Sequence, residues 1–149
     1  MKRKAELRIG SSVLKAAACA LLLAPLAVLA DDAVFNVTLT GPKASGDPDG
    51  RGQARVTLRP ETNEVEVELT YSNIATPTMM QIRKGPTGRD GNVEVPLVVE
   101  QTGRGKAVAR RKSAAPGIVE RIARSPGEYY LVVITEEYPV GALRGPLQN

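Results

Sequence analysis

The stretch that decides the fold is EVEVELTY, residues 64–71. Its apolar residues Val65, Val67, Leu69 and Tyr71 alternate with polar ones. A period of two places the apolar side chains on one face of a β-strand and the glutamates on the other. The sequence therefore predicts a strand with one buried face and one solvated face.

Comparable apolar patterns recur on both sides of this strand. Further strands are expected at residues 34–40, 54–59, 79–83, 93–99, 129–135 and 142–147, and one short helix at 116–124. The short link at 60–63 predicts a hairpin between the second and third strands. Seven short strands with little helix and no internal repeat predict a single all-β domain. The expected architecture is an antiparallel, Greek-key-like β-sandwich with at most one short helix.

Two segments do not fit this pattern of regular strands. Residues 102–117 contain three glycines, a proline and five basic residues, and they are expected to form an irregular connection. Pro96 lies inside a predicted strand but cannot donate a hydrogen bond to a ladder. It therefore predicts an edge strand or the end of a strand.

Residues 1–30 have the composition of a secretory signal peptide. Basic residues come first, an uncharged Ala- and Leu-rich run follows at 16–30, and cleavage is expected after Ala30. That run is shorter than the roughly 20 residues that a spanning helix needs, so no membrane span is expected after cleavage. A lipid anchor at Cys19 is an alternative, disfavoured because most of the apolar run follows this cysteine. The sequence predicts a secreted or periplasmic protein.

Export also accounts for the basic excess of the chain. The whole sequence carries 20 Lys and Arg against 16 Asp and Glu, and residues 1–30 hold five of the basic and one of the acidic groups. The remaining residues carry 15 of each and have no formal net charge. Nucleic-acid binding needs a net basic surface, so it is not expected.

The densest group of basic residues comprises Arg104, Lys106, Arg110, Arg111 and Lys112. Such a run predicts either a solvated loop or a contact for an anionic polymer, for example an envelope polysaccharide. It contains no aromatic residue on which a base could stack, which again disfavours nucleic acid.

The residue types that most catalytic sites require are missing. The chain has no histidine, and its one cysteine lies in the predicted signal peptide. Neither a Ser-His-Asp nor a Cys-His arrangement can therefore be built. Glu64, Glu66 and Glu68 alternate on the solvent face of their strand, which favours a solubilising surface over a glycosidase pair. We expect no enzyme activity and no cofactor.

Asp47 and Asp49 are the metal candidates of the sequence. They stand two residues apart before Gly50, as at the start of an EF-hand calcium loop. Arg51 occupies the third acidic position, and no glutamate closes the loop. Asp before Pro and Asp before Gly are also ordinary turn chemistry. A plain turn is favoured, with a weak calcium site as the alternative.

Four motifs occur in an order that resembles the CHRD domain, the module first recognised in chordin. They are LTG at 39–41, GDPDGRG at 46–52, GPTGRDG at 85–91 and GALRG at 141–145. The family pattern also contains three histidines, and the matching positions here hold Gln81, Arg83 and Ile134. None of these can replace imidazole as a metal ligand, because Gln is a weak donor, Arg repels cations and Ile has no lone pair. The resemblance therefore implies a divergent member without a metal site of the superoxide-dismutase kind.

The resemblance covers residues 33–147. The missing histidines, rather than the resemblance itself, favour a non-enzymatic CHRD-like binding or structural module. Its partner would be an unknown protein or an envelope polysaccharide. The alternative is a small-ligand or metal-dependent activity in the loops Gln81–Gly91 and Thr135–Arg144. A phosphate cradle in the 85–91 loop is disfavoured, because a strand rather than a helix follows it.

Several residues of the motifs are predicted to be structural. Gly85, Gly88, Gly91 and Gly145 would allow positive φ angles or close approach of the backbone. Arg144 stands among glycines and is expected to pair with a nearby carboxylate, with Glu136 or Glu137 as the candidates.

Overall fold

The computed structural model describes residues 31–42 and 45–148, and the predicted signal peptide lies outside these residues. These residues contain eight strands: β1 (Ala33–Thr40), β2 (Arg51–Arg59), β3 (Glu64–Ser72), β4 (Met79–Lys84), β5 (Asn92–Gly103), β6 (Lys106–Arg111), β7 (Tyr129–Ile134) and β8 (Leu143–Pro146). A short helix, α1 (Ile118–Arg124), and one 3-10 turn, η1 (Pro126–Glu128), lie between β6 and β7.

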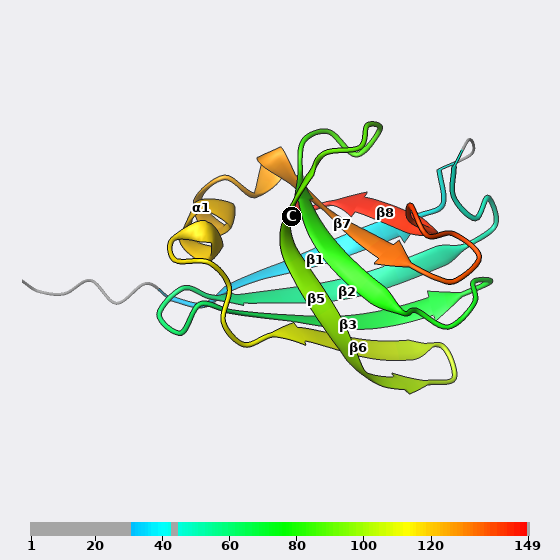
Figure 1. Ribbon diagram of the computed structural model, residues 1–149, viewed down its shortest axis with the longest axis horizontal. Coiled ribbons are helices and arrows are strands. Elements are labelled where there is room, and N and C mark those ends of the chain that lie inside the picture. The colour runs from blue at the N-terminus through cyan, green and yellow to red at the C-terminus, as the bar shows by residue number, and fades with distance from the viewer. Residues whose placement is uncertain (1–30, 43–44, 149) are drawn as a thin grey trace, which may run out of the picture.

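The strands form a closed barrel rather than a sandwich (Figure 1). Their order is β1-β2-β3-β6-β5-β4-β7-β8, every pairing is antiparallel, and β8 closes on β1 where Arg144 lies opposite Thr40. The all-β prediction is confirmed, and the sandwich was wrong. Both architectures bury one face of each strand, so alternation along the sequence does not distinguish them. The long-range pairings of β3 with β6 and of β4 with β7 decide the closure.

The stretch EVEVELTY forms most of β3 and lies between β2 and β6. Val67 lies opposite Val56 of β2 and Ala109 of β6, and all three side chains are buried. The predicted hairpin between β2 and β3 is confirmed. Its turn is closed by Asn63, whose amide donates to the carbonyl of Pro60 and whose φ is 54°.

Residues 102–111 complete a β-hairpin, so the prediction of an irregular connection was wrong for this segment. The two inward residues of β6, Ala107 and Ala109, are alanines, which give a weak apolar signal in the sequence. Gly105 makes the turn with a φ of 70°. Pro96 pairs with Gln81 of β4, whereas the ladder from β5 to β6 begins only at Val98. The proline therefore lies where β5 has one neighbouring strand.

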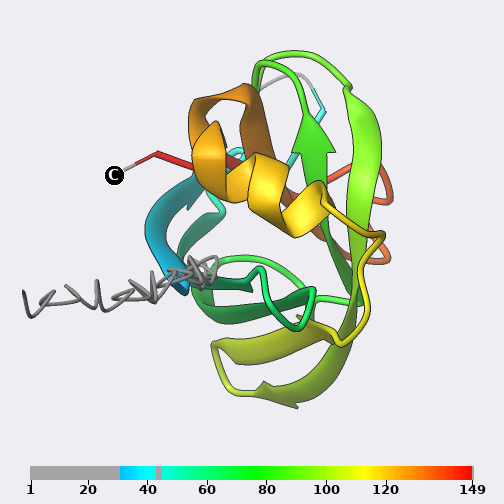
Figure 2. The same cartoon turned by 90° about the vertical axis from the view of Figure 1, so that its left-hand side faces the viewer.

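The predicted short helix is confirmed and covers one end of the barrel (Figure 2). Its residues Ile118, Val119 and Ile122 share one face and are buried in the main core. Within the described part of the chain, no helix has the length and apolar character needed to cross a membrane.

β7 is buried on both of its faces, which positions the site described below. Leu131 and Val133 point into the barrel and belong to the main core. Tyr130, Val132 and Ile134 point outward and form a second, small apolar cluster. Neighbouring segments therefore cover β7 from outside along its whole length.

Candidate functional site

The three positions that the resemblance matched to histidines, Gln81, Arg83 and Ile134, lie together on the outer face of β4 and β7. Gln81 pairs with Val132, and Arg83 pairs with Tyr130. Ile134 lies one outward position further along β7, opposite Met79. The residues between them on β4, Met80 and Ile82, are buried inside the barrel. The structure also brings the segments 81–91 and 135–144 together, because Val132 pairs with Arg144 of β8 on its other side.

Arg144 is buried on this outer face, with only 6% of its side chain exposed. Its Nη2 donates to Asp90 Oδ1 at 2.6 Å and to the carbonyl of Val140 at 3.0 Å. Its Nε is buried and has no partner in the part of the chain that the structure describes. The expected carboxylate partner is therefore Asp90, and not one of the two candidates nearby in the sequence, Glu136 and Glu137. Those glutamates belong to the turn after β7, whereas the loop between β4 and β5 reaches across β7 to Arg144.

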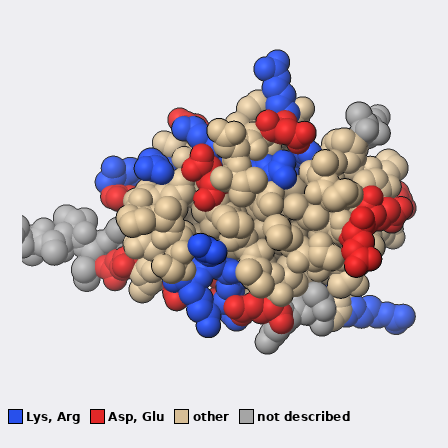
Figure 3. Space-filling view, in the orientation of Figure 1, with Lys and Arg blue, Asp and Glu red and all other residues tan. Residues whose placement is uncertain are grey.

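A second arginine faces the same carboxylate. Arg83 Nη1 lies 3.6 Å from Asp90 Oδ1, and Arg83 Nε donates to Gln81 Oε1 at 2.9 Å. We call Gln81, Arg83, Asp90 and Arg144 the arginine face. Basic and acidic atoms are in contact where the loop between β4 and β5 lies over the sheet (Figure 3). One oxygen of Asp90 thus serves two guanidinium groups.

The loop that carries Asp90 is fixed to the barrel by Tyr130. The phenolic oxygen of Tyr130 donates to the carbonyl of Arg89 at 2.9 Å and accepts from the amide of Gly91 at 2.8 Å. At the start of the loop, the amide of Gly85 donates to the carbonyl of Glu128 at 2.8 Å. The buried tyrosine is therefore satisfied as both donor and acceptor, as a phenol in an apolar site requires.

Gly85, Gly88, Gly91 and Gly145 differ in the structural reason for which a glycine stands at each position. A Cβ on Gly91 would collide with the carbonyl of Lys84, and one on Gly145 would collide with the carbonyl of Thr38. Gly85 has a φ of 128°. Gly88 has open space around the position of a Cβ, and nothing in the structure explains why it is a glycine.

The basic residues 104–112 do not form one patch. Arg104 and Lys106 lie at the turn between β5 and β6, whereas Arg110, Arg111 and Lys112 lie at the other end of β6. Lys106 and Arg111 are five steps of extended strand apart, which is roughly 17 Å. The two ends of β6 therefore present separate basic groups, which Figure 3 shows at the lower edge of the molecule.

The second group borders a cleft of about 240 Å³, which we call the basic cleft. It is lined by Arg59, Glu64, Val65, Glu66, Arg110, Arg111 and Lys112. Arg110 donates to Glu66 at 2.8 Å and to Glu100 at 2.9 Å. The hydrogen bond from Arg110, aided by the charges of Arg110 and Arg59, lowers the pKa of Glu66, although burial opposes the shift. The same bond raises the pKa of Arg110.

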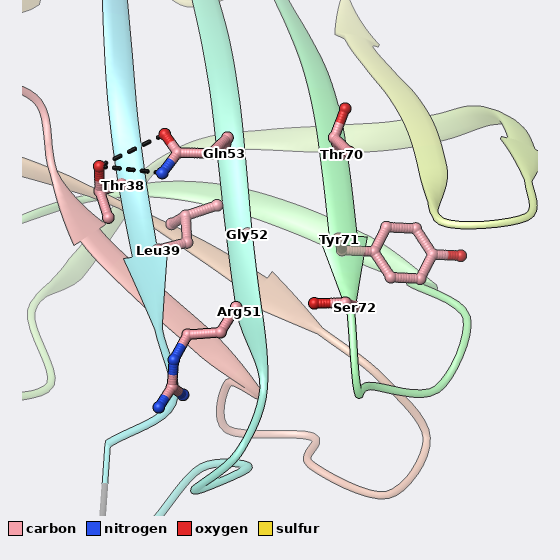
Figure 4. A pocket seen from close by; sticks show the side chains of 8 residues that line it. All are labelled: Thr38, Leu39, Arg51, Gly52, Gln53, Thr70, Tyr71 and Ser72. Atoms are coloured by element: carbon pink, nitrogen blue, oxygen red, sulfur yellow. Dashed lines mark hydrogen bonds between the residues drawn. The ribbon is translucent and has the colours of Figure 1, made fainter.

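A shallow trough of about 220 Å³ lies along β1, β2 and β3 (Figure 4). It is lined by Thr38, Leu39, Arg51, Gly52, Gln53, Thr70, Tyr71 and Ser72. Thr38 and Gln53 bond to each other at 3.3 Å, and Arg51 donates to the carbonyl of Gly50 at 2.7 Å. The Tyr71 ring points away from the trough. The main polar groups of the trough are thus hydrogen-bonded to other groups of the protein, and no set of charged side chains converges in it.

Asp47 and Asp49 lie at the end of the barrel near the turn between β7 and β8. The amide of Asp47 donates to the carbonyl of Ala142 at 3.1 Å. A hydrogen bond with Asp49, then burial, then repulsion by Asp49 and Glu137 raise the pKa of Asp47. Burial and the same carboxylates raise the pKa of Tyr138. Within residues 31–42 and 45–148, no group of three or more acidic side chains is arranged to hold a metal ion. A calcium site stays a prediction.

The comparison with known families agrees with these motifs. The model of the CHRD domain matches residues 35–147. The chain belongs to the CHRD family. Neither the comparison with curated proteins nor the comparison with solved structures gives a match. The resemblance seen in the sequence is thus confirmed, and the loop motif at 85–91 and the closing motif at 141–145 meet in the Asp90–Arg144 ion pair.

Sequence reasoning missed Asp90, Tyr130 and the outer apolar residues of this CHRD domain. Asp90 stands in the GPTGRDG motif and Arg144 in the GALRG motif, so two charged residues of opposite sign in two family motifs were the available signal. Tyr130 gave no such signal, because an uninterrupted apolar run does not reveal which side chains point outward.

Proposed function

We propose that this CHRD protein is a non-enzymatic binding module, secreted or periplasmic, that contacts an anionic envelope polymer through the basic cleft. Family membership and the absence of histidine from the sequence support a binding or structural role over catalysis. The N-terminal sequence supports export.

The observation that carries this proposal is the charge balance of the basic cleft. Four basic side chains and two glutamates line it. Ion pairs occupy Arg59 and Arg110, whereas none in the described residues involves Arg111 or Lys112. Both of these side chains are exposed. Exposed cations beside a cleft favour a polyanion, because binding releases its counterions.

Arg110 has a different role from Arg111 and Lys112 in this proposal. Glu66 and Glu100 hold it in place, so it forms the wall of the cleft. A reversal of its charge would place three carboxylates together and would disturb the barrel as well as the binding. The informative variant is therefore Arg111→Glu combined with Lys112→Glu.

Binding to polygalacturonate and to neutral dextran tests the proposal, with protein purified from a secretory host. We expect salt-sensitive binding to polygalacturonate only. The Arg111→Glu, Lys112→Glu protein should bind about tenfold more weakly, since each exposed contact is worth up to about 1 kcal/mol. The matched control is Arg104→Glu combined with Lys106→Glu, which makes the same charge change at the other end of β6. Equal losses in both proteins, or equal binding to dextran, would contradict a role for the cleft.

A further inference from the structure

The exposed apolar side chains of this protein gather around the arginine face. Among the residues that the structure describes, four large apolar side chains are exposed: Met79 at 41%, Val93 at 46%, Val98 at 64% and Val140 at 49%. Scattered exposed apolar residues are normal, but a group of them beside one site marks a contact surface.

Strand register places Val93 beside Arg83, and it places Met79 and Val98 in the row next to that of Gln81. Val140 lies in the turn before β8, and Val98 also pairs with Arg110 of β6. Val98 pairs with Met79 in the row that continues to Ile134. The neighbouring row on the same face contains Gln81 and Arg144, and rows two residues apart are separated by about 7 Å. Val93 pairs with Arg83, and Val140 provides the carbonyl that accepts from Arg144. The surface is therefore apolar around a pair of buried or half-buried cations.

Not all hydrogen-bond donors of the arginine face have an acceptor in the described residues. Asp90 reaches both arginines with the same oxygen, Oδ1, and no hydrogen bond to its Oδ2 is present in the described residues. The Nε of Arg144 is buried without a partner there. A guanidinium normally binds a carboxylate through two parallel bonds, and a buried donor without an acceptor is costly. Asp90 thus satisfies this site only in part.

Asp90 is also replaceable. Its side chain is 66% exposed, whereas those of Arg83 and Arg144 are 13% and 6% exposed. The main chain on both sides of it is fixed by Tyr130, so the side chain can turn into solvent without moving the loop. The arginines would then present a buried positive charge that needs another anion.

From this geometry we infer that the arginine face binds an amphipathic carboxylate. The carboxylate of the ligand takes the place of Asp90 between Arg83 and Arg144, and the apolar part lies on Met79 and Val98. Asp90 acts as an internal occupant that the ligand displaces. A carboxylate is the class of anion that the site already holds, and the apolar border selects a ligand with a hydrocarbon part over an inorganic anion.

Hexanoate is the probe that tests this inference, with 1-hexanol, acetate and inorganic phosphate as matched comparisons at constant ionic strength. Binding is followed by NMR through the backbone amides of β4, β7 and β8. We expect hexanoate to shift these amides at lower concentration than acetate or phosphate, and hexanol to bind weakly. If hexanol bound as tightly as hexanoate, the inference that the arginines recognise a carboxylate would be overturned. If phosphate bound as tightly as hexanoate, the inference that the apolar border binds a hydrocarbon chain would be overturned.

Two variants separate the site from general effects of charge. Asp90→Asn removes the negative charge of the internal occupant and should bind hexanoate about three- to tenfold more tightly, because a weaker closed state competes less with the ligand. Arg83→Gln should bind at least fivefold more weakly, about 1 kcal/mol at 25 °C. The control is Arg55→Gln on the exposed face of β2, which removes the same charge and should change nothing. Unchanged affinity in both site variants, with dispersed native spectra, would overturn the inference.

Discussion

Tyr130 accepts a hydrogen bond from the amide of Gly91 at 2.8 Å, although 39 positions separate the two residues. The same oxygen donates to the carbonyl of Arg89 at 2.9 Å. One buried phenol on β7 therefore fixes both sides of Asp90 and sets the position of the carboxylate between Arg83 and Arg144. The geometry of the arginine face depends on this tyrosine.

Tyr130→Phe is predicted to loosen the loop and leave the barrel intact. The ring still fills its apolar site, but the variant loses both hydrogen bonds, which are worth about 1–2 kcal/mol together. Urea unfolding should show that loss, and hydrogen exchange at Gly91 should become faster. Tyr129→Phe is the matched control, because no hydrogen bond from the Tyr129 hydroxyl is present in the described residues. Equal stability of the Tyr130→Phe and parent proteins would contradict the role of the Tyr130 hydroxyl in fixing the loop.

How far the sequence predicts this structure depends on the kind of contact. The strand 64–71 and its hairpin partner at 54–59 were predictable, because alternation and a short turn are local properties. Barrel closure was not, since it depends on pairings such as β3 with β6 that leave no trace in either strand alone. The β6 strand was missed because its inward residues are two alanines, which resemble a loop in apolar content.

The same distinction applies to the candidate site. Arg144 stood out in the sequence because glycines surround it, and the prediction that it needs a carboxylate followed from its chemistry. Its partner could not be predicted, because Asp90 is 54 positions away and reaches it across β7. The apolar border of Met79 and Val98 was equally hidden, since the two residues meet only through the register of β4 with β5.

Glu66→Gln is predicted to lower the free energy of unfolding by about 0.5–1 kcal/mol at pH 7. The value is small because the ion pairs of Glu66 with Arg110 and Arg59 are partly solvated. Arg110 lowers the pKa of Glu66 from its usual value of 4.5. The stabilisation is therefore present above that value and is lost as the pH falls through the lowered pKa. Urea unfolding at pH 7 and at pH 2 should show a difference between parent and variant only at pH 7. Glu68→Gln, on the same face of β3 and without an ion pair in the described residues, is the control. A difference that persists at pH 2 would show that Glu66 acts through packing instead.

Asp47→Asn is predicted to stabilise the protein at pH 7. Asp49, burial and Glu137 raise the pKa of Asp47 from 3.8, so the folded state holds this proton more tightly than the unfolded state. Its contribution to stability is therefore full below pH 3.8 and falls as the pH rises through the raised pKa. Thermal unfolding should show a gain for the variant at pH 7 and none at pH 3. Calcium, with magnesium as the control ion, should leave the melting temperature of the parent unchanged. A calcium-dependent rise that is absent in Asp47→Asn would instead establish the calcium site.

Gly145→Ala is predicted to damage the closure of the barrel. The added Cβ would collide with the carbonyl of Thr38 and with the side chain of Val37, both on β1. The clash is with main chain, which cannot move without opening the pairing of β1 with β8, so we expect a loss of about 3 kcal/mol or more. Gly88→Ala is the matched control, because its Cβ meets no atom within 4 Å, and a change within about 0.5 kcal/mol is expected. Denaturant unfolding of both proteins measures the difference. A Gly145→Ala protein as stable as Gly88→Ala would mean that β1 and β8 do not approach each other this closely.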